Sequence, residues 1–292
     1  RFGIKHYTIN FMDLFKKYVV DDFVNQYLNG KTPNPCVKCN SMIKWEALIN
    51  FASEIETNYI ATGHYAQIEK KKGVYFLKKG ADKTKDQSYM LWDIDPSYLS
   101  KTIFPIGDLT KIEVREYAIK HDLETATRAE SQDLCFVLGD DYNQFLHEII
   151  PEKMKKIKKG PIEDEAGNII GEHDGFTKYT IGQRKGLQLS YPEPRYVKKI
   201  NPLNNTLTIA KKDSIYSKKC EANNINLLSP NITFPLKVNA KIRYNSNESP
   251  AIIKRKKEDL IIDFDEPQLA ITPGQSIVFY QKEEVLGGAI IK

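Results

Sequence analysis

The chain has 292 residues, of which 41% are hydrophobic and 28% charged, and its formal net charge is +5. This length suffices for two or three domains, and the composition is that of an ordinary globular protein. No apolar stretch approaches the roughly 20 residues that cross a bilayer, and the first residues lack the apolar region of a secretory signal. We therefore expect a cytoplasmic protein with no membrane partner. Its four cysteines are too few for a disulfide scaffold and favour metal binding or redox chemistry.

The first part of the chain alternates helical and strand patterns. Apolar residues recur at helical spacing over 11–28 and again over 43–55, and a short apolar run at 59–62 predicts a buried strand that ends at Gly63 and His64. This order is typical of an open α/β sheet, whose ligands bind at the carboxyl ends of its strands. We expect His64 to lie at such an end.

The pattern then becomes mainly β. A hairpin is predicted with strands at 66–69 and 74–78, and a capping box of Thr110 and Glu113 opens a helix that ends near residue 120. Beyond about residue 145, glycines and prolines multiply and alternating segments appear at 195–200, 206–209, 236–244 and 276–280. The second half is therefore expected to hold a small central module followed by a β-barrel or sandwich.

Basic residues are concentrated in one window. Residues 178–212 contain eight lysines and arginines and a single acidic residue, Glu193, interleaved with tyrosines and glycines. Such an excess suits binding to a phosphate backbone. A solvated surface is the alternative interpretation of the same pattern.

Three cysteines lie among polar, loop-forming residues. Cys36 and Cys39 belong to the stretch NPCVKCN at 34–40, and Cys135 belongs to ESQDLCF at 130–136. We expect all three on loops that face solvent or a substrate. Metal binding and thiol chemistry are both compatible with this spacing.

Several short motifs together resemble those of a known family, the tRNA-uridine 2-sulfurtransferases, also called tRNA 2-thiouridylases. The motifs occur in the family's order and extend over the whole chain: GKTPNPCVKCN (30–40), ATGHYA (61–66), KDQSY (85–89), FPIGDLT (104–110), YTIGQRKGL (179–187), TPGQS (272–276) and VLGG (285–288).

The resemblance implies a fold of three parts. Residues 1–145 would be the remainder of an α/β ATP pyrophosphatase domain, like the adenine-nucleotide alpha hydrolases. Residues 146–212 would form a central tRNA-binding module, and 213–292 a C-terminal antiparallel β-barrel that binds tRNA. Family members carry a Ser-Gly-Gly-x-Asp-Ser phosphate loop, which this sequence does not contain. We therefore expect a shortened first domain and impaired ATP chemistry, because such a loop cradles pyrophosphate.

The chemistry implied by the resemblance is 2-thiolation of the wobble uridine, U34, in tRNAs for Lys, Glu and Gln. ATP with Mg²⁺ would adenylate the uracil O2, and a persulfide on Cys135 would supply sulfur. Cys39 would complete its release and leave a disulfide. The sulfur would come from a relay protein or a cysteine desulfurase. The alternative is a non-catalytic fragment that binds tRNA or carries an iron–sulfur cluster.

Cys36 departs from the pattern of those members that carry Asp at this position. The thiolates of Cys36, Cys39 and Cys135 would alternatively hold a [4Fe-4S] cluster. Zinc is the weaker option because a fourth ligand is not evident. Cys220 matches no family motif and is expected to be a bystander.

The remaining assignments follow from the resemblance. Gly63 would approach the ATP base, and Asn34, Pro35 and Cys36 would border the flipped-out uridine. The other expected contacts are with tRNA: His64, Lys85, Asp86, Gln87, Arg243, Tyr244 and Gln275. Plainer interpretations also exist for some of them, namely a strand-ending glycine, a packed histidine and a polar cluster at a helix entry.

Overall fold

The computed structural model describes residues 3–127, 134–137, 139, 141–189 and 191–292. The first helical stretch consists of α1 (Met12–Phe15), the π-helical η1 (Lys16–Val20) and α2 (Asp21–Leu28). It confirms the helix predicted over 11–28. The second stretch consists of α3 (Pro35–Lys38), the π-helical η2 (Cys39–Ala47) and α4 (Leu48–Glu54).

The second stretch begins earlier than the predicted 43–55. Asn34 is extended and Pro35 occupies the first helical turn, where a missing N–H costs nothing and the fixed φ suits the helix. Cys36 and Cys39 therefore lie on a helix, and the expectation of a loop at these two positions was wrong. The spacing of apolar residues missed this start, although Val37 of α3 is buried in the main core.

Two short strands and a hairpin follow. Strand β1 (Ile60–Ala61) pairs in parallel with β4 (Thr102–Ile103), as expected for part of an open α/β sheet. The predicted hairpin is formed by β2 (Ala66–Lys71) and β3 (Val74–Lys79). Between β3 and β4 lie the 3₁₀ turns η3 (Ser88–Leu91) and η4 (Pro96–Lys101).

The predicted capping box is present at the start of α5 (Lys111–Lys120). Glu113 N donates to Thr110 Oγ1 at 3.3 Å, and Thr110 N donates to Glu113 Oε2 at 2.6 Å. The turn η5 (Glu124–Thr127), α6 (Tyr142–Ile149) and α7 (Pro151–Met154) follow. Leu146 and Met154 pack with Phe23 of α2, so α6 and α7 rest on the first helical stretch.

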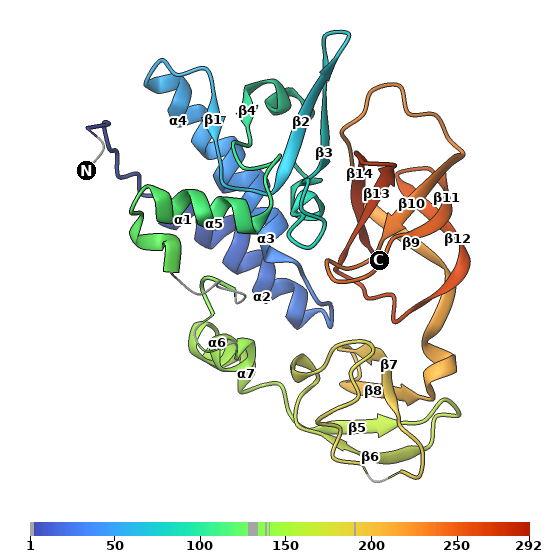
Figure 1. Ribbon diagram of the computed structural model, residues 1–292. Helices are drawn as coiled ribbons and strands as arrows, with labels where there is room; N and C mark the ends of the chain where they lie inside the picture. The colour runs from blue at the N-terminus through green and yellow to red at the C-terminus, as the bar shows by residue number, and fades with distance from the viewer. Residues whose placement is uncertain (1–2, 128–133, 138, 140, 190) are drawn as a thin grey trace.

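The central module is a four-stranded sheet with its own core. Its strands are β5 (Gly160–Glu163), β6 (Ile169–His173), β7 (Tyr196–Asn201) and β8 (Thr206–Ala210), in the order β6-β5-β8-β7, with η7 (Phe176–Lys178) beside them. Ile162, Val197 and Leu207 are fully buried in this core. In Figure 1 the module lies below the rest of the molecule.

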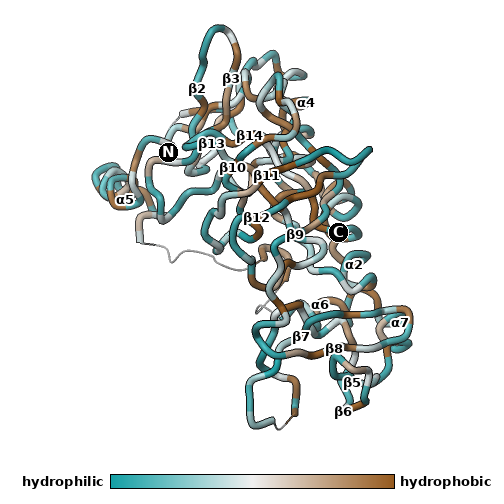
Figure 2. The backbone as a smooth tube through the Cα atoms, turned by 90° about the vertical axis from the view of Figure 1, so that its right-hand side faces the viewer, coloured by the Kyte–Doolittle hydropathy of each residue, from teal (hydrophilic) through white to brown (hydrophobic). Residues whose placement is uncertain are grey.

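The C-terminal part is a closed six-stranded barrel, as the β pattern predicted. After η8 (Lys212–Ile215), its strands are β9 (Tyr216–Leu227), β10 (Leu236–Lys241), β11 (Ser249–Lys256), β12 (Asp259–Leu269), β13 (Ser276–Gln281) and β14 (Glu284–Ile291). The order β13-β10-β11-β12-β9-β14 closes through pairing of β13 with β14. Closure removes free strand edges, and Figure 2 shows hydrophobic stretches along the barrel strands.

The barrel and the first part of the chain share one core. Strand β3 joins β14 through the pair Lys78 and Glu284. Trp92 is fully buried and belongs to the same cluster as Leu77, Val278 and Val285. The N-terminal region is thus packed directly on the barrel. In the described part of the chain, no helix has the length and apolarity needed to cross a membrane.

Candidate active site

The three cysteines singled out in the sequence come together in space. Cys36 is exposed on the first turn of α3, Cys39 is partly buried at the start of η2, and Cys135 is exposed. Phe136 packs edge-on against Phe15 and Phe23, with ring centroids 5.7 and 5.3 Å apart. The segment that carries Cys135 is therefore anchored on the first helical stretch.

The charges of these thiols influence one another. Burial raises the pKa of Cys36, and the thiolates of Cys39 and Cys135 raise it further. Burial also raises the pKa of Cys39, the ammonium group of Lys44 opposes this shift, and Cys135 adds to it. Because Coulomb interactions of this kind fall off within a few ångströms to a Debye length, residues 96 positions apart in the sequence share one site. The disulfide that the resemblance implies for Cys39 and Cys135 requires such proximity.

The three thiols, as the structure describes them, do not form a site for a single metal ion. Among the residues that the structure describes, no three His, Cys, Asp or Glu side chains lie close enough together to hold one metal ion. This finding argues against a single zinc ion held by the three thiols.

His64 is buried directly after β1. Only 9% of its surface is exposed, Thr62 Oγ1 lies 2.9 Å from its Nδ1, and its ring is 5.5 Å from that of Trp45. Burial, assisted by the positive charge of Lys44, lowers the pKa of His64 to about 4. The imidazole is therefore neutral at physiological pH. Its contact with a nucleic acid stays a prediction and would involve only the small exposed part of the ring.

Gly63 lies beside His64 at the carboxyl end of β1, as expected. It is exposed, and a Cβ added there would meet no heavy atom within 4 Å. The space above this glycine is therefore available to a ligand. Its assignment to the ATP base is compatible with this geometry and stays a prediction.

Asn34 and Pro35 lie directly before the cysteines. Asn34 Nδ2 is 3.4 Å from Met90 Sδ, Asn40 Nδ2 donates to Met90 O at 2.9 Å, and Pro35 is buried. These contacts attach the start of α3 to the turn η3. Cys36 is the exposed residue of this group.

In the polar cluster 85–87, Asp86 and Gln87 form hydrogen bonds with other parts of the protein. Tyr65 N donates to Gln87 Oε1 at 3.0 Å, and Gln87 N donates to Tyr65 O at 2.9 Å. Asp86 accepts from Gly80 N at 3.0 Å and from Ser88 N at 3.1 Å. Lys85 is half-buried. Asp86 and Gln87 thus fix the entry to η3, and any contact with tRNA would come in addition.

Arg243, Tyr244 and Gln275 lie between parts of the chain. Arg243 Nη2 donates to Ile181 O at 3.1 Å and to Ala270 O at 2.8 Å. Gln275 Nε2 donates to Thr32 O at 2.8 Å, and the Tyr244 ring packs near Tyr89, 6.0 Å between centroids. The sequence motifs gave no sign of these internal roles.

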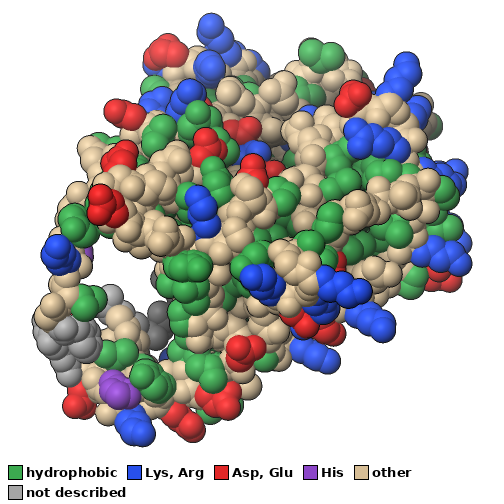
Figure 3. Space-filling view, turned by 90° about the horizontal axis from the view of Figure 1, so that it is seen from above, with side chains coloured by type: hydrophobic (Ala, Val, Ile, Leu, Met, Phe, Trp, Pro, Cys, Tyr) green, Lys and Arg blue, Asp and Glu red, His purple; other side chains and the backbone are tan. Residues whose placement is uncertain are grey.

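The basic window occupies the central module. Lys198 pairs with Glu165 at 2.7 Å and Lys211 with Glu193 at 2.7 Å. The other exposed basic side chains of the window are Lys178, Arg184, Lys185, Lys199 and Lys212. On the opposite, upper face of the molecule, basic and acidic side chains are interspersed (Figure 3). Within the window, the exposed basic side chains outnumber its single acidic residue, Glu193.

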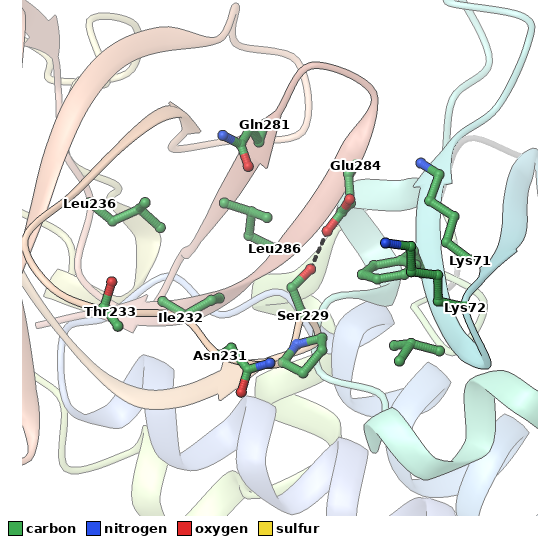
Figure 4. Close-up of a pocket in the computed structure, with 13 residues that line it drawn as sticks. Lys71, Lys72, Ser229, Asn231, Ile232, Thr233, Leu236, Gln281, Glu284 and Leu286 are labelled. Carbon is green, nitrogen blue, oxygen red and sulfur yellow. Dashed lines mark hydrogen bonds between the residues drawn. The ribbon is translucent and has the colours of Figure 1, made fainter.

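Two features lie apart from the thiols. Cys220 is on β9 opposite Ile262, and burial raises its pKa to about 12, which agrees with a bystander. A cavity of about 820 Å³ lies between the hairpin β2–β3 and the segment 229–236, where Ser229 donates to Glu284 (Figure 4). Its lining includes none of the predicted site residues.

Comparison with known families accounts for nearly the whole chain. Residues 1–139 match a model described as a tRNA methyl transferase HUP domain, residues 143–211 a tRNA methyl transferase PRC-barrel domain, and residues 217–291 an aminomethyltransferase beta-barrel domain. The chain thus has the three-domain organisation of a class of proteins, and the descriptions of its first two domains refer to tRNA methyl transferases.

The relatives narrow the class. The tRNA-specific 2-thiouridylase MnmA of Natranaerobius thermophilus is 43% identical over 295 residues, which cover 100% of this chain and 79% of the relative. The proteins of the same name from Halothermothrix orenii and Clostridioides difficile are 45% and 43% identical over 99% and 100% of the chain, and 81% of each relative is covered. The chain belongs to the tRNA-specific 2-thiouridylase family, which confirms the resemblance.

Proposed function

We propose that this protein is an enzyme that thiolates uridine in tRNA, and more specifically the 2-position of the wobble uridine U34 in tRNAs for Lys, Glu and Gln. The single observation that carries the proposal is the meeting of Cys36, Cys39 and Cys135 at one exposed site, within reach of one another's charge. The names of the relatives support the reaction class.

The target base is proposed to leave its stack and enter the space beside α3. An enzyme that acts on C2 of uracil needs the base flipped out, and Asn34, Pro35 and Cys36 would border it. The central module and the barrel, proposed to extend over 146–212 and 213–292, would hold the tRNA. The exposed cations of the basic window, such as Arg184 and Lys185, suit phosphate contacts.

ATP with Mg²⁺ is the proposed co-substrate, and its adenosine would lie over Gly63. Adenylation turns the uracil O2 into a good leaving group. The described residues offer open space at Gly63 for this ligand.

Sulfur is proposed to travel through Cys135 and Cys39. A sulfur-relay protein or a cysteine desulfurase would load a persulfide on exposed Cys135, and its outer sulfur would bond to C2 as adenylate leaves. The Cys39 thiolate would then attack Cys135 Sγ, so that a Cys39–Cys135 disulfide forms and the sulfur stays on the base. A cellular thiol must reduce this disulfide before the next cycle. Lys44 favours the attacking thiolate.

The test combines the protein with unmodified tRNA for Lys, ATP, Mg²⁺, cysteine and a cysteine desulfurase. We expect a Cys135 persulfide by mass spectrometry and 2-thiouridine at position 34 of the digested tRNA. Thiolation should be lost in Cys39→Ser and Cys135→Ser and kept in the matched control Cys220→Ser. Thiolation at another position, or undiminished thiolation by Cys135→Ser, would contradict the proposal. The persulfide readout needs no ATP.

A further inference from the structure

Two loops from distant parts of the chain meet at the segment that precedes the cysteines. Thr32 N donates to Pro273 O at 2.9 Å, and Gln275 Nε2 donates to Thr32 O at 2.8 Å and to Pro33 O at 3.3 Å. Gly274 is packed so closely that an added Cβ would lie 3.0 Å from Thr32 O. The barrel loop 272–275 is therefore bonded to the segment 30–34 and packs closely against it.

The central module holds the same segment from its other side. Thr32 Oγ1 donates to Thr180 Oγ1 at 3.3 Å. An added Cβ on Gly30, which has a φ of +66°, would lie 2.8 Å from Pro202 Cγ. All three modules thus meet at one junction, which we call the 30–34 junction.

The junction is followed by a stiff connection to the thiols. Pro33 and Pro35 have fixed φ angles, and a residue before proline is restricted as well, so Thr32 and Asn34 have little freedom. Asn34 is extended, and α3 begins at Pro35. A displacement of the backbone at Thr32 is therefore passed on to Cys36 and Cys39 rather than absorbed.

We propose that Gln275 is a positioning residue that holds the start of α3, and with it Cys36 and Cys39, at a fixed place relative to the tRNA-binding modules. Its Nε2 donates to two carbonyl oxygens of the junction, at 2.8 and 3.3 Å, and a carboxamide nitrogen carries only two hydrogens. Binding a phosphate through this group would break those bonds. The resemblance had suggested that Gln275 contacts tRNA, whereas the geometry points to an internal role.

The inference rests on the proposed function for its purpose, but the hydrogen-exchange readout of its test does not. Gln275→Met keeps the length of the side chain and removes both donors. Gln281→Met, at the exposed end of β13, is the matched control. Pro33→Ala leaves Gln275 intact and loosens the connection. Hydrogen exchange of residues 31–47 and the Kd for unmodified tRNA are measured on each full chain.

A positioning role predicts that exchange over 31–47 accelerates by about tenfold in Gln275→Met, because lost bonds lower the local opening free energy. Pro33→Ala should accelerate it as well, and Gln281→Met should not. The Kd for tRNA should stay within about twofold, while kcat for thiolation falls and KM does not. Unchanged exchange in Gln275→Met, or about tenfold weaker tRNA binding, would overturn the inference. Failure of the proposed function would instead appear as no 2-thiouridine with any variant, wild type included.

Discussion

The substitution Arg243→Met tests how firmly the central module is attached to the barrel. The guanidinium group of Arg243 donates to Ile181 O at 3.1 Å, to Ala270 O at 2.8 Å and also to Thr272 Oγ1. Ile181 belongs to the central module and the other two acceptors to the barrel. Methionine fills a similar volume and donates no hydrogen bond, so the variant removes the bonds and little else.

The magnitude follows from these contacts. A hydrogen bond from a charged donor contributes about 1.5–3 kcal/mol. In the variant, Ala270 O still accepts a hydrogen bond from Thr272 Oγ1 at 2.8 Å. Ile181 O loses its bond from Arg243, and this loss is expected to account for most of the effect. Burial lowers the pKa of Arg243. The cost of removing its charge from water therefore offsets part of the stability that its hydrogen bonds contribute. We therefore expect Arg243→Met to lower the free energy of unfolding by about 3 kcal/mol.

Urea unfolding followed by far-UV circular dichroism measures this difference. Arg255→Met is the matched control, because Arg255 lies exposed on β11, where its Nε donates to Lys257 O at 3.2 Å and its Nη2 lies 3.9 Å from Glu258 Oε2. The control should change the free energy of unfolding by less than about 0.5 kcal/mol. If Arg243→Met were no more destabilising than this control, the reasoning that Arg243 attaches the central module to the barrel would be refuted.

Two further predictions concern His64 and the basic window. The folded pKa of His64, about 4, lies below its ordinary value, so the unfolded chain takes up the proton first, and stability falls as pH drops from about 6.5 to 4. The loss in the free energy of unfolding should reach about 3 kcal/mol at pH 4, measured by urea unfolding. The variant His64→Gln should lack this loss. Equal pH profiles of the two proteins would show that His64 is not buried as described. Lys185→Met should reduce the slope of log K for tRNA against log salt by about 0.7–0.9, whereas Lys198→Met, already paired with Glu165, should change it less; an equal or smaller effect of Lys185→Met would remove Lys185 from the RNA surface.

Local patterns predicted most of the elements. The helix over 12–28, the hairpin β2–β3, the capping box at Thr110 and the strands of the barrel each have a signal within a few residues of sequence. The start of α3 was missed because Pro35 and the polar residues after it suggest a loop as readily as a first helical turn. The alternating pattern alone left a barrel and a sandwich open, because closure through β13 and β14 depends on distant pairing. The resemblance implied the barrel, and the structure confirms it.

The site was predictable in part. Motifs identified the three thiols and implied that they converge, and the structure brings them together. Motifs did not reveal that Arg243 and Gln275 bond to the protein's own backbone. Glycines, prolines and polar side chains in a loop suit both a nucleic-acid contact and a close junction of modules, and only the tertiary structure shows which partner such a group has.

The central claim is that Cys39 and Cys135 relay sulfur as thiols at a shared site. Mass spectrometry of the protein purified without oxygen, together with iron and sulfide analysis, tests this most directly. The account predicts a persulfide on Cys135 or a Cys39–Cys135 disulfide after sulfur loading, without stoichiometric iron. Stoichiometric iron and sulfide that disappear in each of Cys36→Ser, Cys39→Ser and Cys135→Ser would contradict it and establish an iron–sulfur cluster held by the same three residues.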